Sequence, residues 1–203
     1  GFNNRQVVAY RNLDELHERF YSVTHRVSVR EVLDLPDSSD VTLQCRLAKP
    51  AERVYRQLER DLVADVKSGL VTASNALVRL LRLSQITGGT VTNDAGLADR
   101  VDESKQKLLE ELLSDLPTAE PVVVFCRFLA DLDRVHESAE RMGRGSMELS
   151  GRRKDLEAKW LDSDSNGAPI LAAQIDSGCE GVDLTRARVC VFYSVGYSLG
   201  RYQ

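Results

Sequence analysis

Long apolar runs are absent from this sequence. The longest contain about five residues, whereas a helix that crosses a membrane needs about 20. The first residues, GFNNRQ, show no signal-peptide pattern. We therefore expect neither a membrane span nor secretion.

Cysteine pairs at metal-binding spacing are also missing. The four cysteines stand at positions 45, 126, 179 and 190, and the three histidines lie far from them in the sequence. No C-x-x-C pair occurs, so a zinc site is not expected. Cys126 and Cys190 each stand in an apolar run, which predicts buried thiols. Free thiols suit a reducing cytoplasm.

No phosphate-binding signature occurs in the chain. The pattern G-x-x-x-x-G-K-[ST] is absent, and the glycines near Cys179 do not have the spacing G-x-G-x-x-G. A nucleoside triphosphate would therefore have to be held mainly by another domain. The net charge is −4, so any binding to a polyanion requires a local basic patch.

The first half of the chain has mainly helical patterns. The stretch VTLQCRLA (41–48) alternates apolar and polar residues, which predicts a half-buried strand. Helices are predicted over 50–66, with Gly69 at the end, and over 74–86, with Ser74 as N-cap. Residues 88–103 read as a loop, and 102–116 as another helix. We expect residues 1–100 to form a mainly helical N-terminal part of the structure.

The second half, residues 101–203, has the pattern of an α/β core. Apolar strands are predicted over 121–126, 146–150, 169–174 and 188–194. Helical patterns follow the first strand and, over 152–162, the second. Alternation of buried strands with helices indicates a parallel sheet flanked by helices. Four loops should then meet at the carboxyl edge of the sheet, where such folds bind ligands.

The loop QIDSGCEGVD after the third of these strands is rich in small and acidic residues. Small residues let a phosphate approach main-chain N–H groups, and Asp183 could accept a hydrogen bond from a ribose hydroxyl. Alternatively, the glycines only turn the chain and Asp183 caps a helix. The basic run Arg152-Arg153-Lys154 allows two interpretations as well, a polyanion contact or a solvated helix face, and Arg127 could pair with a carboxylate.

The order of these segments resembles the second RecA-like lobe of Swi/Snf-type helicase-like ATPases of superfamily two, in a phage or bacterial form. LVRLLRLSQITGG and ESKQKLLEELL resemble helices of that lobe. VVVFCRF is similar to motif IV, ELSGRRKDLEAKWLDS to the segment after it, and AAQIDSGCEGVDLTRARVCVFY to motif V. The sequence departs from motif V at Cys179 and Asp183, where the family usually has Gly and Asn. Motif VI would begin just after Gln203.

The resemblance implies a function. ATP and Mg²⁺ would be held mainly by a first RecA-like lobe of the same polypeptide, and double-stranded DNA would cross both lobes. Gly181 and Asp183 would face the nucleotide. The DNA backbone would be approached by Arg127, Ser150, Arg152, Arg153, Lys154, Gln174 and Ser177. We expect this polypeptide alone to hydrolyse no ATP, because the Walker lysine and the arginine fingers lie elsewhere. The expected location is the cytoplasm of a bacterial host.

Two other functions remain open at this stage. The chain could be a stand-alone Rossmann-like protein that binds a small nucleotide through the glycine-rich loop. It could also be a protein-interaction module that docks a partner through the helical segment 50–116. No candidate catalytic or metal-binding residue emerges for any of the three functions.

Overall fold

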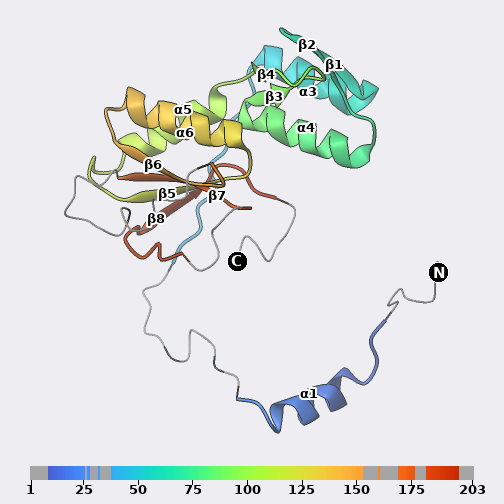
Figure 1. The fold of residues 1–203 in the computed structure, drawn as a ribbon, viewed down its shortest axis with the longest axis vertical. Helices are drawn as coiled ribbons and strands as arrows, with labels where there is room; N and C mark the ends of the chain where they lie inside the picture. Colours follow the sequence, from blue (N-terminus) through green and yellow to red (C-terminus); the bar gives the residue numbers. More distant parts are fainter. Residues whose placement is uncertain are drawn as a thin grey trace. The chain divides into compact units, whose positions relative to one another are not determined.

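The fold was taken from a computed structural model of the chain, which describes residues 9–25, 27, 32, 38–152, 160, 169–176 and 182–196. The chain forms two compact units, Gly1–Thr42 and Leu43–Gln203. The first contains helix α1 (Leu13–Tyr21), which has no buried residue. All other described helices and strands belong to the second unit (Figure 1). No described helix has the length and apolar character needed to cross a bilayer.

The core of the second unit is a four-stranded parallel sheet in the order β6-β7-β5-β8. Its strands are β5 (Val122–Cys126), β6 (Ser146–Leu149), β7 (Ile170–Gln174) and β8 (Val189–Phe192). Val122, Val123 and Val124 of β5 have no exposed surface, as expected for a strand covered on both faces. The predicted α/β class, a parallel sheet flanked by helices, is confirmed.

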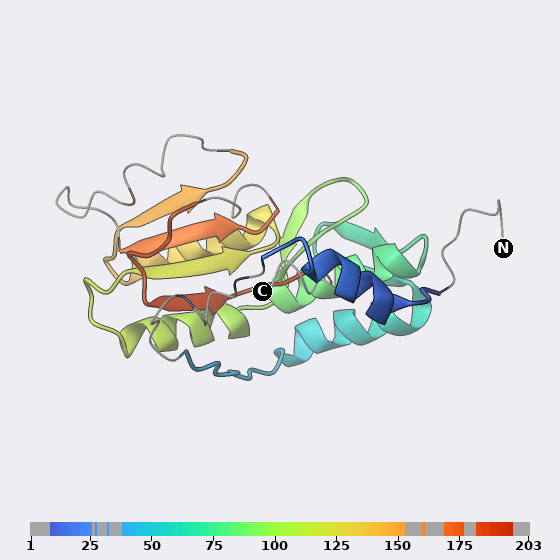
Figure 2. The same ribbon diagram turned by 90° about the horizontal axis from the view of Figure 1, so that it is seen from below.

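Helices α5 (Ser104–Ser114) and α6 (Leu129–Arg141) cover one face of this sheet (Figures 1 and 2). Leu109 and Leu113 of α5 and Leu132 of α6 pack there against the strands. Trp160 packs on the other face and is 1% exposed. The remainder of the helix predicted over 152–162 lies outside the described residues, apart from Arg152 itself.

Residues 48–102, here called the small lobe, precede the sheet. They comprise α3 (Lys49–Asp61), the hairpin β1 (Val63–Val66) and β2 (Gly69–Thr72), α4 (Ala76–Gly88), and the hairpin β3 (Thr90–Thr92) and β4 (Ala98–Arg100). The lobe has its own apolar core, built around Leu58, Val71, Ile86 and Val91. The predicted domain boundary near residue 100 stays a prediction; in sequence it lies between β4 and α5.

Several predicted element boundaries in this part are wrong. Residues 41–48 form no strand, because no described strand pairs with them. The side chains of Val41 and Leu43 are exposed. The helix predicted to run to residue 66 ends at Asp61, since Leu62 adopts a left-handed conformation with φ 61°. Gly69 instead begins β2. The loop predicted over 88–103 contains the β3–β4 hairpin.

A joint at Gly88 and Gly89 connects the small lobe to the sheet. The Tyr193 hydroxyl donates to the Gly88 carbonyl at 3.2 Å, and Arg134 Nη2 donates to the Gly89 carbonyl at 2.5 Å. Arg134, 1% exposed, also donates to Gln106 Oε1 at 2.8 Å. A Cβ at Gly88 would lie 2.6 Å from Oδ1 of the buried Asp131, so any other residue there would require the Asp131 side chain to shift.

Candidate functional site

The carboxyl edge of the sheet collects several of the predicted site residues. In the strand register Cys126 pairs with Gln174, and Leu149 pairs with Ala173. Gln174 is therefore placed between the ends of β5 and β6, although Arg127 and Gln174 are far apart in sequence. Parallel strands bring their carboxyl ends to one edge, which is the usual place for ligands in open α/β sheets.

Arg127 directly follows β5 and is half-buried. Its backbone N–H donates to the Ser194 hydroxyl at 2.8 Å, and that hydroxyl donates to Asp131 Oδ2 at 2.5 Å. The Arg127 guanidinium lies 5.2 Å from the centre of the Phe128 ring. The end of β5 is thus tied to the segment after β8, which holds Arg127 at the carboxyl edge of the sheet.

Tyr193 and Ser194, directly after β8, are both buried and held by several contacts. Lys105 Nζ donates to the Tyr193 carbonyl at 3.0 Å and lies 5.4 Å from the centre of its ring. Burial raises the pKa of the Tyr193 hydroxyl. Burial likewise raises the pKa of Asp131, although the hydrogen bond from Ser194 opposes that shift.

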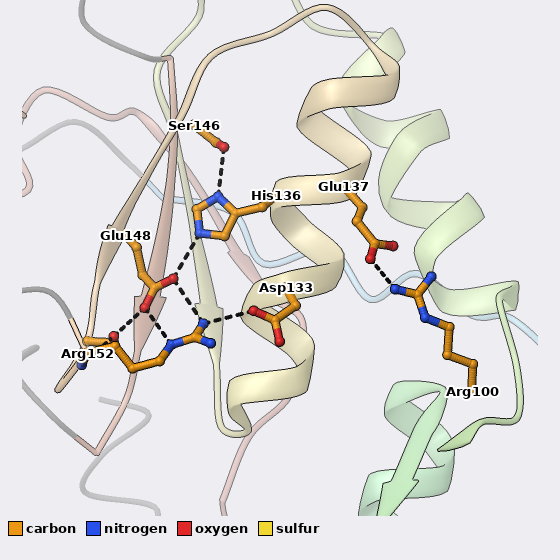
Figure 3. Close-up of polar contacts among 8 residues, drawn as sticks. Arg100, Asp133, His136, Glu137, Ser146, Glu148 and Arg152 are labelled. Atoms are coloured by element: carbon orange, nitrogen blue, oxygen red, sulfur yellow. Dashed lines mark hydrogen bonds and ion pairs between the residues drawn. The ribbon is translucent and has the colours of Figure 1, made fainter. Parts of the chain in front are cut away.

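Arg152 is held at the end of β6 by two carboxylates (Figure 3). Its Nε donates to Glu148 Oε1 and its Nη2 to Glu148 Oε2, each at 3.0 Å. The same Nη2 donates to Asp133 Oδ1 at 3.0 Å. Two bonds to one carboxylate fix the plane of a guanidinium more firmly than a single contact can.

Glu148 is the centre of this cluster and is 1% exposed. His136 Nε2 lies 3.0 Å from Glu148 Oε2, and His136 Nδ1 lies 2.7 Å from the Ser146 hydroxyl (Figure 3). The Ser150 hydroxyl donates to Glu148 Oε1. Burial alone would raise the pKa of Glu148, but the hydrogen bonds from Ser150, Arg152 and His136 outweigh it and lower that pKa.

Two predicted site residues have hydroxyl or carboxylate groups already engaged by neighbours. Ser150 is buried, and its hydroxyl also accepts the Arg152 backbone N–H at 3.1 Å. Asp183 is exposed, and its Oδ1 accepts from the Thr185 hydroxyl at 2.6 Å and from the Thr185 N–H at 2.9 Å. These bonds lower the pKa of Asp183. The Asp183 carboxylate thus closes a local turn, a structural role similar to the helix cap that the sequence left as an alternative.

Other predicted site residues lie outside the part of the chain that the structure describes. They are Arg153, Lys154, Ser177 and Gly181. Cys179 lies outside it too. Cys126 is buried as predicted, and burial raises its pKa well above the usual value. Cys190 is exposed, so its predicted burial is wrong: it lies on the face of the edge strand β8 opposite to Val189 and Val191.

Sequence reasoning missed the residues that hold the two arginines. Glu148, His136, Asp133, Asp131 and Ser194 were not expected to matter. One signal was present: a glutamate inside the short apolar strand SMEL is unusual, because a buried carboxylate needs partners. Across the described residues, no three His, Cys, Asp or Glu side chains gather in a way that could hold a metal ion.

Comparison with known proteins gives distant similarities. No family model matches the sequence. Protein p41 of Acyrthosiphon pisum secondary endosymbiont phage 1 is 22% identical over 184 residues, a match that covers 89% of this chain and 38% of that protein. The chain therefore spans well under half the length of this relative.

Two solved structures are similar to the chain at low scores. The C-terminal part of the Fun30 ATPase domain matches with a TM-score of 0.44 and 19% identity, over 49% of this chain and 34% of that one. The Pyrococcus furiosus Hef helicase domain matches with a TM-score of 0.41 and 15% identity, over 75% of this chain and 30% of that one. The fold class therefore rests on the strand pairing of this chain itself.

Proposed function

We propose that the chain is the C-terminal lobe of an ATP-dependent, helicase-like DNA translocase of the Swi/Snf type. One observation carries the proposal: the parallel sheet brings Arg127, Arg152 and Gln174, which lie at or just beyond the ends of three different strands, to its carboxyl edge. Together with the resemblance of the surrounding segments to motifs IV and V, this edge suits one wall of a DNA groove.

In this proposal, duplex DNA lies along the carboxyl edge of the sheet. Arg127 and Arg152 bind backbone phosphates, with Gln174, Ser177, Arg153 and Lys154 nearby. Ser150 supports the Arg152 backbone through its hydroxyl. Contacts to phosphates position a duplex but do not read its sequence. The lobe therefore binds duplexes of mixed sequence with similar affinity.

The nucleotide is shared with a first lobe of the same polypeptide. That lobe holds most of ATP and Mg²⁺, while Gly181 and Asp183 line the near side of the cleft. No Walker-type phosphate loop occurs in the 203 residues, so the chain alone turns over no ATP. In this proposal the protein is encoded by a phage or prophage gene and acts in the cytoplasm of the bacterial host.

DNA binding by the chain tests this proposal. Affinity for a labelled mixed-sequence duplex is measured by fluorescence anisotropy between about 50 and 200 mM salt. We expect weak binding whose log affinity falls linearly with log salt, because phosphate contacts release counterions. The Arg127→Ala variant should bind more weakly, with the slope reduced by about 0.9, the value for one phosphate.

Arg188→Ala is the matched control. Arg188 immediately precedes β8, so it lies at the opposite, amino edge of the same sheet, and its side chain is 84% exposed. This variant loses the same charge and should retain the slope of the wild type. Equal losses in both variants, or affinity independent of salt, would contradict a DNA groove at the carboxyl edge. Thermal stabilisation by NAD but not by DNA would support the small-nucleotide alternative.

A further inference from the structure

Arg152 is held by two carboxylates of different character. Glu148 has a side chain that is 2% exposed and grips the guanidinium at both Nε and Nη2. Asp133, on α6, has a side chain that is 54% exposed and accepts from Nη2 alone. Nη1 takes part in none of these three bonds. The Arg152 side chain is itself 39% exposed.

Glu148, the buried partner, is held by several neighbours besides Arg152. His136 and the Ser150 hydroxyl both bond to Glu148, and Ser146 in turn bonds to His136. Removing one member of a buried, hydrogen-bonded pair is costly, because the other charge is left without a partner. The contact between Glu148 and Arg152 is therefore the permanent one.

The exposed partner is replaceable. Single ion pairs between solvent-exposed side chains contribute little, because water and salt screen them. A DNA phosphate can make to Arg152 the same kind of charge-assisted bond that Asp133 makes, so the two anions can exchange at this guanidinium. Glu148 and Asp133 place two negative charges against the single positive charge of Arg152, so Asp133 weakens the attraction of this guanidinium for a DNA phosphate while it stays in place.

We propose that Glu148 positions Arg152 for a DNA phosphate, and that Asp133 competes with that phosphate for the same guanidinium. On binding, the phosphate takes the place of Asp133, while the two bonds to Glu148 keep the guanidinium plane fixed. Glu148 is a positioning residue and Asp133 is an internal competitor that weakens the resting affinity. The inference rests on the proposed DNA groove and adds a device that sets its affinity.

The two carboxylates provide a matched pair of variants. Glu148→Gln and Asp133→Asn each remove one negative charge next to the same guanidinium. If charge alone mattered, both variants would bind DNA more tightly. In this proposal they act in opposite directions: Asp133→Asn raises duplex affinity, by up to about fivefold for an exposed pair, and Glu148→Gln lowers it.

The test measures duplex affinity and its salt slope for Asp133→Asn, Glu148→Gln, Arg152→Ala and Arg152→Lys, with circular dichroism and thermal unfolding to follow folding. Arg152→Ala should lose affinity and about 0.9 of slope. Arg152→Lys should recover only part of the affinity, because an ammonium cannot donate the two parallel hydrogen bonds that the Arg152 guanidinium makes to the Glu148 carboxylate.

A double variant separates positioning from a structural effect. If Glu148 acts through Arg152, then Glu148→Gln changes nothing further in the Arg152→Ala background. An equal loss in both backgrounds overturns the inference, as does a rise of affinity in both carboxylate variants. If the wild type binds with a salt slope and Arg127→Ala reduces it, but the Arg152 variants do not, this inference fails and the proposed function stands. If the wild type shows no salt-dependent binding, both fail.

Discussion

Asp131 and Glu148 are buried carboxylates whose surroundings shift their pKa values in opposite directions. Asp131 is 1% exposed, and its burial outweighs the hydrogen bond from Ser194, so its pKa is raised. Glu148 is equally buried, but its hydrogen-bond donors outweigh burial, so its pKa is lowered. A difference in pKa between folded and unfolded chains makes stability depend on pH. These two residues should therefore respond oppositely to acid.

The stabilities of Asp131→Asn and Glu148→Gln, each relative to the wild type, should change with pH in opposite directions. With a raised pKa in the fold, the contribution of Asp131 is fully present below its unfolded pKa of about 3.9 and is lost as pH rises through the folded value. The wild-type advantage over Asp131→Asn should therefore shrink from acid toward neutral pH. The contribution of Glu148 is present above its unfolded pKa of about 4.3 and is lost as pH falls through the lowered folded value. Urea unfolding across this range measures both; parallel trends would be evidence against these shifts.

At the scale of single elements, α4 shows how a helix boundary depends on the backbone as well as on residue type. The sequence predicts Ser74 as its N-cap, which is wrong. Asn75 is the cap: its backbone is extended, with φ −155°, and its Oδ1 accepts from the Val78 N–H at 3.0 Å. Either residue type can cap a helix. Which one does so depends on where the chain turns after β2.

Asn75→Ala should lower the free energy of unfolding by about 1 kcal/mol, because one N–H in the first turn loses its acceptor. Ser74→Ala is the neighbouring control and should change it by less than about 0.5 kcal/mol. Asn75→Asp should retain most of the stability. Chemical denaturation followed by circular dichroism gives all three values. A larger loss in Ser74→Ala than in Asn75→Ala would show that the cap is misassigned.

The sequence was most informative for long or fully buried elements. Strands β5 and β7 are continuous apolar runs, and their parallel order follows from the helices between strands. The strands of the small lobe have three or four residues, too few for a periodic pattern to appear. The loops with Arg127 and Arg152 could be placed at one edge of the sheet from the sequence. The residues that hold Arg152 could not, because Asp133 and His136 reach the cluster around Glu148 only through the packing of α6 on β6.

At the scale of the second unit, the contacts at Gly88 and Gly89 fix where the small lobe sits on the sheet. Gly89 has φ +94°, and a Cβ there would collide with the Asp102 carbonyl and lie 3.1 Å from Arg134 Cζ. Gly96, in the turn between β3 and β4, has φ +81° and nothing within 4 Å. The two glycines share the left-handed backbone and differ in crowding.

Gly89→Ala should therefore destabilise the protein by about 3 kcal/mol, through backbone strain and overpacking together. Gly96→Ala should cost about 1 kcal/mol, because only the strain applies. Thermal and urea unfolding of both variants measure the difference. Equal losses would mean that the joint is less crowded than the structure shows.

Tyr193 and Arg134 hold the joint through the carbonyls of Gly88 and Gly89. Side chains of the small lobe add to these contacts, because Arg134 Nε also donates to the Thr90 hydroxyl at 3.1 Å and Arg100 pairs with Glu137 on α6 (Figure 3). A differently composed lobe that ends its last helix in two glycines would present the same two acceptors to the sheet. A replacement lobe would therefore keep this seat on the sheet only if it also supplied counterparts of the Thr90 hydroxyl and the Arg100 guanidinium.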